Sequence, residues 1–210
     1  LKSWLEVPKV DHHASVDMTE LLAARRAINE GLPEGERVSV TDLLVLLVAR
    51  ALEMKRIFNA HMEPDGIKIY RNVHMGIAIA LENALVVPVV RDANKKRLRE
   101  ISAEIKDLAA RARENRLTET DFIGGTFTLT NLGGYRSTEH FTPIINPPQA
   151  AILGIGRTRD MPAAVDGEVR IRPMMSLSLS HDHRIVDGAP AAEFLGILMR
   201  MIEAPYRALY

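Results

Sequence analysis

Residues 180–188 read Ser-His-Asp-His-Arg-Ile-Val-Asp-Gly, and they join a predicted strand to a predicted helix. The run before them, Met174 to Ser180, is apolar and hydroxyl-rich and predicts a buried strand. The segment after them, Ala191 to Met201, is apolar and predicts a helix. His183 is therefore expected where a strand ends, a position that presents side chains to a cleft in α/β proteins.

His183 is a candidate general base, because an unperturbed imidazole titrates near pH ~6.5 and exchanges protons at neutral pH. Asp187, four residues later, is placed to orient the turn or to pair with an arginine. The same pattern also fits a histidine in a turn, with Asp187 as the N-cap of the following helix. Chemistry alone leaves these two interpretations about equally favoured, since the pattern is short.

Patterns along the rest of the chain predict a mixed sheet with helices packed on it, because strands and helices alternate without a βαβ repeat. Ser39, with Asp42 three residues later, is expected to cap a buried helix. The predicted helices are Thr19 to Asn29, Val40 to Lys55 and Leu98 to Asn115. The predicted strands are Val10 to Met18, Val73 to Leu81, Ala84 to Val90, Thr126 to Asn131 and Ala150 to Arg157, with a tight hairpin turn at Val165 to Val169.

Thr130 is a second candidate for chemistry. It belongs to an alternating segment, Thr126 to Asn131, that breaks at Gly133 and Gly134. A hydroxyl at the end of a strand can donate a hydrogen bond to a developing oxyanion. The alternative is an ordinary threonine-rich strand face, because threonine favours strands.

Composition excludes several classes of protein. The 27 lysines and arginines balance 27 aspartates and glutamates, which argues against a broad nucleic-acid surface. The chain has no cysteine, so it has no cysteine nucleophile or thiolate metal site. No apolar run is long enough to span a bilayer. His12 and His13 are adjacent in a predicted strand and point to opposite faces, so we expect no metal site there.

Five blocks of sequence, taken together, resemble the catalytic domain of the dihydrolipoamide acyltransferases, the core components of 2-oxo acid dehydrogenase complexes. They occur in the family's order and cover most of the chain. The blocks are Gly76 to Ala80, Leu85 to Ala93, Gly124 to Asn131, Thr142 to Gly154 and Leu177 to Gly188.

The resemblance implies a CoA-dependent acyltransferase fold of the chloramphenicol acetyltransferase type. Residues 1–210 would form one catalytic domain, with the lipoyl and subunit-binding domains absent. Such domains form homotrimers with active sites at subunit interfaces, and the trimers build a 24- or 60-subunit core. The expected partners are the decarboxylase and dihydrolipoamide dehydrogenase components, without nucleic acid or membrane. The expected location is the cytoplasm, or the mitochondrial matrix in a eukaryote.

The resemblance also implies the reaction, which transfers an acyl group between the dihydrolipoyl thiol and coenzyme A. The lipoyl group is carried on a separate domain, and acetyl is favoured over succinyl or branched-chain acyl groups. His183 falls at the family's catalytic histidine, and Asp187 at a carboxylate that holds the site together. Thr130 falls at the oxyanion donor, from a neighbouring subunit. Coenzyme A is expected near Thr130, Asn131 and Ser39, although the capping role already explains Ser39.

Three features depart from the family pattern. His181 stands where the family often has an aromatic residue, and the segment Leu43 to Ala49 lacks a lysine that the family often has. The chain also starts after a family segment that contains an arginine, which puts a partner for Asp187 in doubt.

Two other functions remain open from the sequence. One is a stand-alone CoA acyltransferase of the chloramphenicol type, acting on a small alcohol or amine. The other is a core subunit that assembles without catalysing. The block Thr142 to Leu153 favours the complex-bound enzyme over the first, and the presence of His183 with Thr130 argues against the second.

Overall fold

The fold is built on one mixed sheet of six strands with helices on one face, in a computed structural model of the chain. The structure describes residues 2–209, apart from the side chains of residues 2, 4 and 209. The strands lie in the order β1 (Lys9–Asp17), β10 (Glu168–Asp182), β9 (Ala151–Val165), β8 (Phe127–Asn131), β4 (Met75–Ile77) and β7 (Val89–Val90). Strand β8 runs parallel to β9 and β4, and the other neighbours are antiparallel. The predicted mixed sheet is confirmed.

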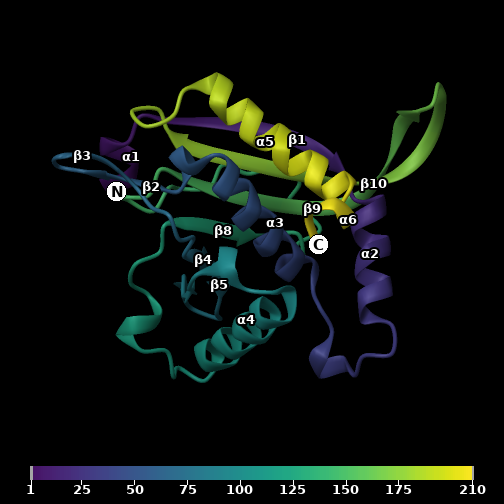
Figure 1. Cartoon of the computed structure of the whole chain (residues 1–210), viewed down its shortest axis with the longest axis horizontal. Coiled ribbons are helices and arrows are strands. Elements are labelled where there is room, and N and C mark those ends of the chain that lie inside the picture. The colour runs from purple at the N-terminus through teal and green to yellow at the C-terminus, as the bar shows by residue number, and fades with distance from the viewer. Residues whose placement is uncertain (1, 210) are drawn as a thin grey trace.

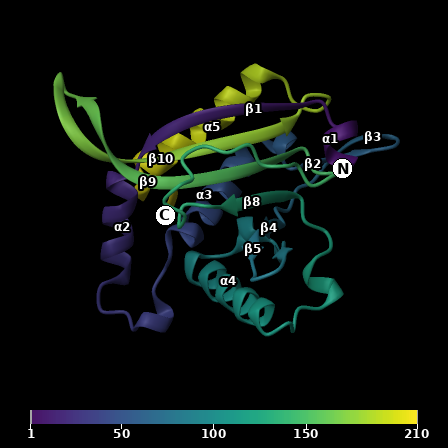
Figure 2. The ribbon, with the colours of Figure 1, turned by 180° about the vertical axis from the view of Figure 1, so that it is seen from behind.

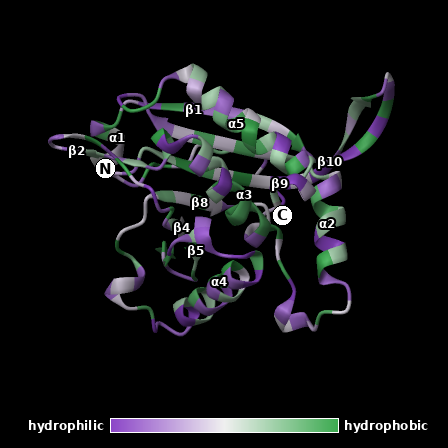
Figure 3. Ribbon diagram, viewed as in Figure 1, coloured by the Kyte–Doolittle hydropathy of each residue, from purple (hydrophilic) through white to green (hydrophobic). Residues whose placement is uncertain are grey.

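The helices α3 (Val40–Met54) and α5 (Gly188–Glu203) lie against the sheet, and the strands come to the front when the molecule is turned by 180° (Figures 1 and 2). The main apolar core fills the space between these helices and the sheet (Figure 3). The other helices are α1 (Lys2–Glu6), α2 (Thr19–Asn29), α4 (Leu98–Arg113) and α6 (Tyr206–Leu209), with single 3₁₀ turns at Glu34–Glu36, Arg56–Phe58, Ala93–Lys95 and Glu119–Asp121. A two-stranded ribbon, β2 (Ala60–Glu63) and β3 (Gly66–Ile69), stands beside the sheet.

The predicted capping box at the start of α3 is confirmed. Ser39 Oγ accepts a hydrogen bond from the Asp42 N–H at 3.1 Å, and Asp42 Oδ2 accepts one from the Ser39 N–H at 2.8 Å. Two backbone donors that the first turn leaves without partners are satisfied in this way. The cap fixes where α3 begins beneath the sheet.

The two predicted strands Val73 to Leu81 and Ala84 to Val90 pair as a hairpin around residues 82–83, but both strands are interrupted. Short strands β5 (Ile79–Ala80) and β6 (Leu85–Val86) pair at the tip, while β4 pairs with β7 in the main sheet. The Ala78 N–H bonds instead to the Leu129 carbonyl of β8, and Pro88 has no N–H to give to a ladder. These two features break the hairpin in its middle.

Strands β9 and β10 extend well beyond their predicted ends and form an arm that projects from the body (Figure 1). Asp166 and Gly167 join them with φ angles of 53° and 82°, as the predicted tight turn requires. The arm contains arginines and prolines, which break the alternation of apolar and polar residues by which a strand is predicted. Its strands were therefore predicted too short. Val169 and Ile171 on the arm are 79% and 66% exposed, so the arm carries apolar side chains into solvent.

Candidate active site

His183 lies on the turn between β10 and α5, as the sequence predicts. Its N–H donates to the Pro8 carbonyl at 3.0 Å, which ties the turn to the start of β1. The Asp182 carbonyl accepts from the N–H groups of Ile185 and Val186, both at 3.0 Å. The backbone of the turn is therefore held from two sides.

An ion pair between the buried Asp182 and the partly exposed Arg184, which the sequence analysis did not identify, fixes the same turn. The Asp182 side chain is 2% exposed and accepts from the Arg184 N–H at 3.0 Å and from Arg184 Nε at 2.9 Å. The Arg184 Nη2 donates to Asp182 Oδ2 at 2.5 Å, and the hydrogen bonds to this carboxylate raise the pKa of Arg184. The Asp-x-Arg spacing of Asp182 and Arg184 could have indicated this pair, but the spacing does not show which nearby carboxylate the arginine binds.

Asp187 has a looser place than the sequence suggested. It occupies the N-cap position of α5, as one of the two interpretations has it, but its side chain makes no capping hydrogen bond. Its Oδ1 lies 3.8 Å from His183 Nδ1, a charge contact longer than a hydrogen bond. Asp187 is 82% exposed and His183 46% exposed, so this pair stands in solvent in the single chain.

A row of three imidazoles runs from β1 to the turn. The His181 ring lies between the rings of His12 and His183, with centroids 5.3 Å and 5.9 Å away. Burial lowers the pKa of His181, and the neighbouring imidazoles lower that pKa further. His13 points to the other face, where its Nδ1 lies 2.9 Å from Ser178 Oγ, so the two adjacent histidines do not share a site.

Thr130 and Asn131 end β8 and lie beside the start of α3. The Asn131 amide donates to Thr41 Oγ1 at 2.9 Å, and its oxygen accepts from the Gly133 N–H at 2.7 Å. The Thr130 hydroxyl makes no side-chain hydrogen bond within the described residues, which leaves it free to donate to a ligand. Because Thr41 follows Ser39 closely, the three residues predicted near coenzyme A lie in one region.

The strand register separates Thr130 from His183 within one chain. Thr130 is opposite Gly154 on β9, whereas His181 is opposite Ala151 on the same strand. The offset is about 10 Å along β9, and two strand spacings add about 10 Å across the sheet. His183 continues further from Gly154, so the two side chains lie apart within one chain.

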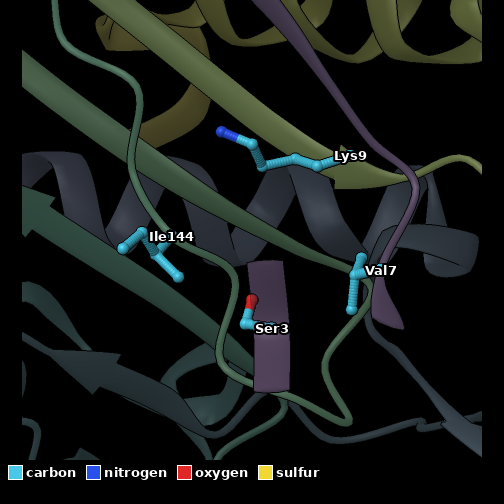
Figure 4. Close-up of a pocket in the computed structure, with 4 residues that line it drawn as sticks. All are labelled: Ser3, Val7, Lys9 and Ile144. Carbon is cyan, nitrogen blue, oxygen red and sulfur yellow. The ribbon is translucent and has the colours of Figure 1, made fainter. Parts of the chain in front are cut away.

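A cavity of about 190 Å³ lies where β1 begins (Figure 4). Ser3, Val7, Lys9 and Ile144 line it, and the Ser3 hydroxyl donates to the Ile145 carbonyl at 2.7 Å. Lys9 Nζ lies 3.3 Å from Asp11 Oδ2, so a charge pair borders the cavity. In the described part of the chain, no three His, Cys, Asp or Glu side chains gather to hold a metal ion, and no helix is long and apolar enough to cross a membrane.

The family model described as 2-oxoacid dehydrogenases acyltransferase (catalytic domain) matches residues 1–210. The chain belongs to this family. It is 40% identical over 207 residues to the dihydrolipoyllysine-residue acetyltransferase component of the pyruvate dehydrogenase complex of Rickettsia felis, a match that covers 98% of this chain and 50% of that protein. It is 39% identical over 197 residues to the succinyltransferase component of the 2-oxoglutarate dehydrogenase complex of Rickettsia bellii, covering 92% of this chain and 49% of that protein. The chain thus spans about half the length of the curated relatives it matches.

Solved structures of this family have the same fold. The cubic core of a pyruvate dehydrogenase multienzyme complex matches with a TM-score of 0.92 and 35% identity, over 100% of this chain and 87% of that one. The dihydrolipoamide acetyltransferase of Azotobacter vinelandii, studied for the catalytic roles of a serine, a histidine and an asparagine, matches equally well at 36% identity over the same shares. A chloramphenicol acetyltransferase matches with a TM-score of 0.58 and 16% identity, over 94% of this chain and 89% of that one. The predicted family and fold class are confirmed.

Proposed function

We propose that this chain is the catalytic domain of a dihydrolipoyllysine-residue acyltransferase in a 2-oxo acid dehydrogenase complex. The observation that carries the proposal is the half-exposed His183 on a turn fixed by the ion pair of Arg184 with the buried Asp182, in a chain of this family. Residues 1–210 act as one catalytic domain. The chain spans about half of its relatives' length, and the lipoyl group reaches this catalytic domain on a separate domain.

His183 acts as the general base. Its Nδ1 is the nitrogen nearer to Asp187, which leaves Nε2 to accept the proton from the attacking thiol. The thiolate adds to the thioester carbonyl, and the carbon–sulfur bond to the leaving thiol then breaks. The leaving thiolate takes the proton back from Nε2. Both thiols come with the substrates, so the chain needs no cysteine of its own.

Thr130 supplies the oxyanion donor from a neighbouring copy. Its free hydroxyl can donate to the oxygen of the tetrahedral intermediate, where negative charge develops. Within one chain, Thr130 lies about 10 Å from the position of His181 along β9 and about 10 Å across the sheet, so it cannot act on the same thioester as His183 of its own chain. A head-to-tail contact that closes as a threefold ring brings the two half-sites together. The likeness to a cubic core supports a trimer that assembles further into a 24- or 60-subunit core.

The catalytic residues studied in the Azotobacter vinelandii enzyme support these roles. A hydroxyl side chain, a histidine and a third polar residue are the types examined there. Thr130, His183 and Asp187 provide the same three types here. Asp187 holds the site together through its charge contact with His183 rather than through a hydrogen bond.

Coenzyme A is the substrate that we place near Thr130, Asn131 and Ser39, where β8 meets the start of α3. The lipoyl group comes on a separate domain, and the partners are the decarboxylase and dihydrolipoamide dehydrogenase components. The acyl group is acetyl, which the Rickettsia felis relative supports, with succinyl and branched-chain groups as alternatives. Turnover with acetyl-, succinyl- and isobutyryl-CoA ranks the three. Since the relatives named here are bacterial, we propose a cytoplasmic location.

The decisive experiment is His183→Ala in the assembled protein. Without its base, acyl transfer from acyl-CoA to dihydrolipoamide should fall by about 10²–10⁴-fold, while the oligomer size in sedimentation stays the same. Near-normal turnover of this variant would show that His183 is not the general base. A wild-type protein that stays monomeric at micromolar concentration would contradict a site shared between two copies.

A further inference from the structure

His181 is a buried titratable group that the mechanism above does not use. It pairs with Val10 of β1 and Ala151 of β9, near the end of β10, and its side chain is fully buried. The backbone of Val186 interacts with this ring and raises its pKa, but neither ring nitrogen makes a hydrogen bond of normal geometry. Burying poorly satisfied polar atoms costs stability, and an apolar ring avoids that cost. An imidazole held at this expense is a candidate for a role beyond packing.

The place of the ring suggests that role. The His181 ring is 5.9 Å from the His183 ring and inclined to it by 30°, a nearly parallel arrangement. On its other side the His12 ring lies 5.3 Å away at 38°. His12 in turn lies next to Gly188, the first residue of α5, 3.9 Å from where a Cβ would stand. The three rings therefore reach from β1, which carries His12, to the turn that leads into α5.

The His183 ring has little else to hold it. Its backbone is fixed by Pro8, but among the described residues its ring makes no hydrogen bond, and Asp187 is 3.8 Å away. Nearly half of the side chain is exposed. A base free to rotate about its side-chain bonds spends less time in the reactive geometry, so a planar contact from beneath should raise kcat.

We propose that His181 is a positioning residue for His183, whose ring it orients by ring-to-ring contact. The inference rests on the proposed function, in which His183 is the base. The lowered pKa of His181 supports it, because a neutral neighbour does not repel the proton that His183 carries during turnover. Burial and the charges of His12 and His183 lower this pKa, and they act against the Val186 backbone hydrogen bond and the Asp11 carboxylate, which raise it.

Three substitutions at this position separate orientation from packing, measured in the assembled protein with acetyl-CoA and dihydrolipoamide. His181→Ala removes the ring and should lower kcat by about ten- to a hundredfold, with both KM values within about twofold. His181→Phe restores a planar ring and should recover most of that loss. His181→Leu fills the volume without a plane and should recover much less. Equal kcat values for the Leu and Phe variants, or an unchanged kcat for the Ala variant, would overturn the proposal.

Leu177→Ala is the matched control for stability. Leu177 is a fully buried residue of the same strand, four positions from His181 and away from the turn. It should lower the unfolding temperature about as much as His181→Ala while leaving kcat near that of the wild type. If Leu177→Ala lowers kcat as far, the effect of His181 is only general destabilisation and the proposal fails.

The two proposals fail in different ways. An inactive wild type, or an active His183→Ala variant, contradicts the proposed function. An active wild type with an inactive His183→Ala variant, together with unchanged kcat in His181→Ala, contradicts the positioning role alone.

Discussion

His183 and Thr130 lie at two ends of one sheet and are held there by different means. The turn that carries His183 depends on side chains: an ion pair, a row of imidazoles and one backbone hydrogen bond to Pro8. Thr130 depends on backbone, since β8 is paired on both sides by parallel neighbours. Single substitutions should therefore disturb the structure of the His183 turn. A substitution of Thr130 should leave β8 folded and remove only the hydroxyl.

The largest effect at the Thr130 end should come from Thr130→Ala. Losing one oxyanion donor costs about 10²–10³ in kcat, and the strand should stay folded because its ladder is unchanged. Thr130→Ser keeps the hydroxyl and serves as the control. Steady-state turnover together with the unfolding temperature checks both. Wild-type turnover in the Ala variant would mean that another group stabilises the oxyanion.

Co-assembly of the two inactive variants sharpens the comparison. If each site takes His183 from one copy and Thr130 from the next, refolding equal amounts of His183→Ala and Thr130→Ala together should restore about a quarter of wild-type turnover. Each variant refolded alone is the control. No recovery in verified mixed oligomers would place both groups in one chain, against the strand register.

A smaller effect is expected at the other end, where Asp182→Asn keeps the shape of the buried carboxylate and removes its charge. The variant should lose about 1–3 kcal/mol of unfolding free energy, because Arg184 loses charge-assisted hydrogen bonds but is partly exposed and can rehydrate. Urea denaturation measures this. Asp187→Asn, at an exposed position without a capping bond, should change stability by less than about 0.5 kcal/mol. The reverse order would show that Asp187, not Asp182, holds the turn.

The smallest effect concerns pH. Burial lowers the pKa of His61, His74 and His181 in the folded chain. Below pH ~6.5 the unfolded chain therefore binds more protons than the folded one, and stability is lost as the pH falls through this range. Urea midpoints between pH 7.5 and 5.5 should decrease, and less steeply for His181→Phe. A midpoint that is constant over this range, or an equal slope in the variant, would contradict this view of the buried imidazole.

Local patterns predicted much of the fold. The Ser39 capping box, the α2 boundaries and the tight turn at Asp166 and Gly167 each depend on a few adjacent residues, and the structure has them as expected. His183 at a strand end followed from the change of pattern on either side. Such features can be predicted from the sequence because the residues that cause them are adjacent or only a few positions apart.

The features that were not predicted depend on contacts that local sequence patterns do not reveal. The contact of His12 with His181 joins positions far apart in the chain, and only the register of β1 on β10 creates it. The pairing of Arg184 with Asp182 was not predicted, because Asp182 and Asp187 are both close to Arg184 in sequence and the pattern does not choose between them. The turn of the arm was predicted, but the length of its strands β9 and β10 was missed because many of the arm's residues are exposed and its apolar residues do not alternate along the sequence.

The separation of His183 from Thr130 also has a consequence for the order of events in the cell. Under the proposed function, a chain that has not yet met a second copy holds the base in one place and the oxyanion donor in another, and so has no complete site. Turnover then begins only when subunits associate, and the concentration of protein, through mass action, becomes the first control on it.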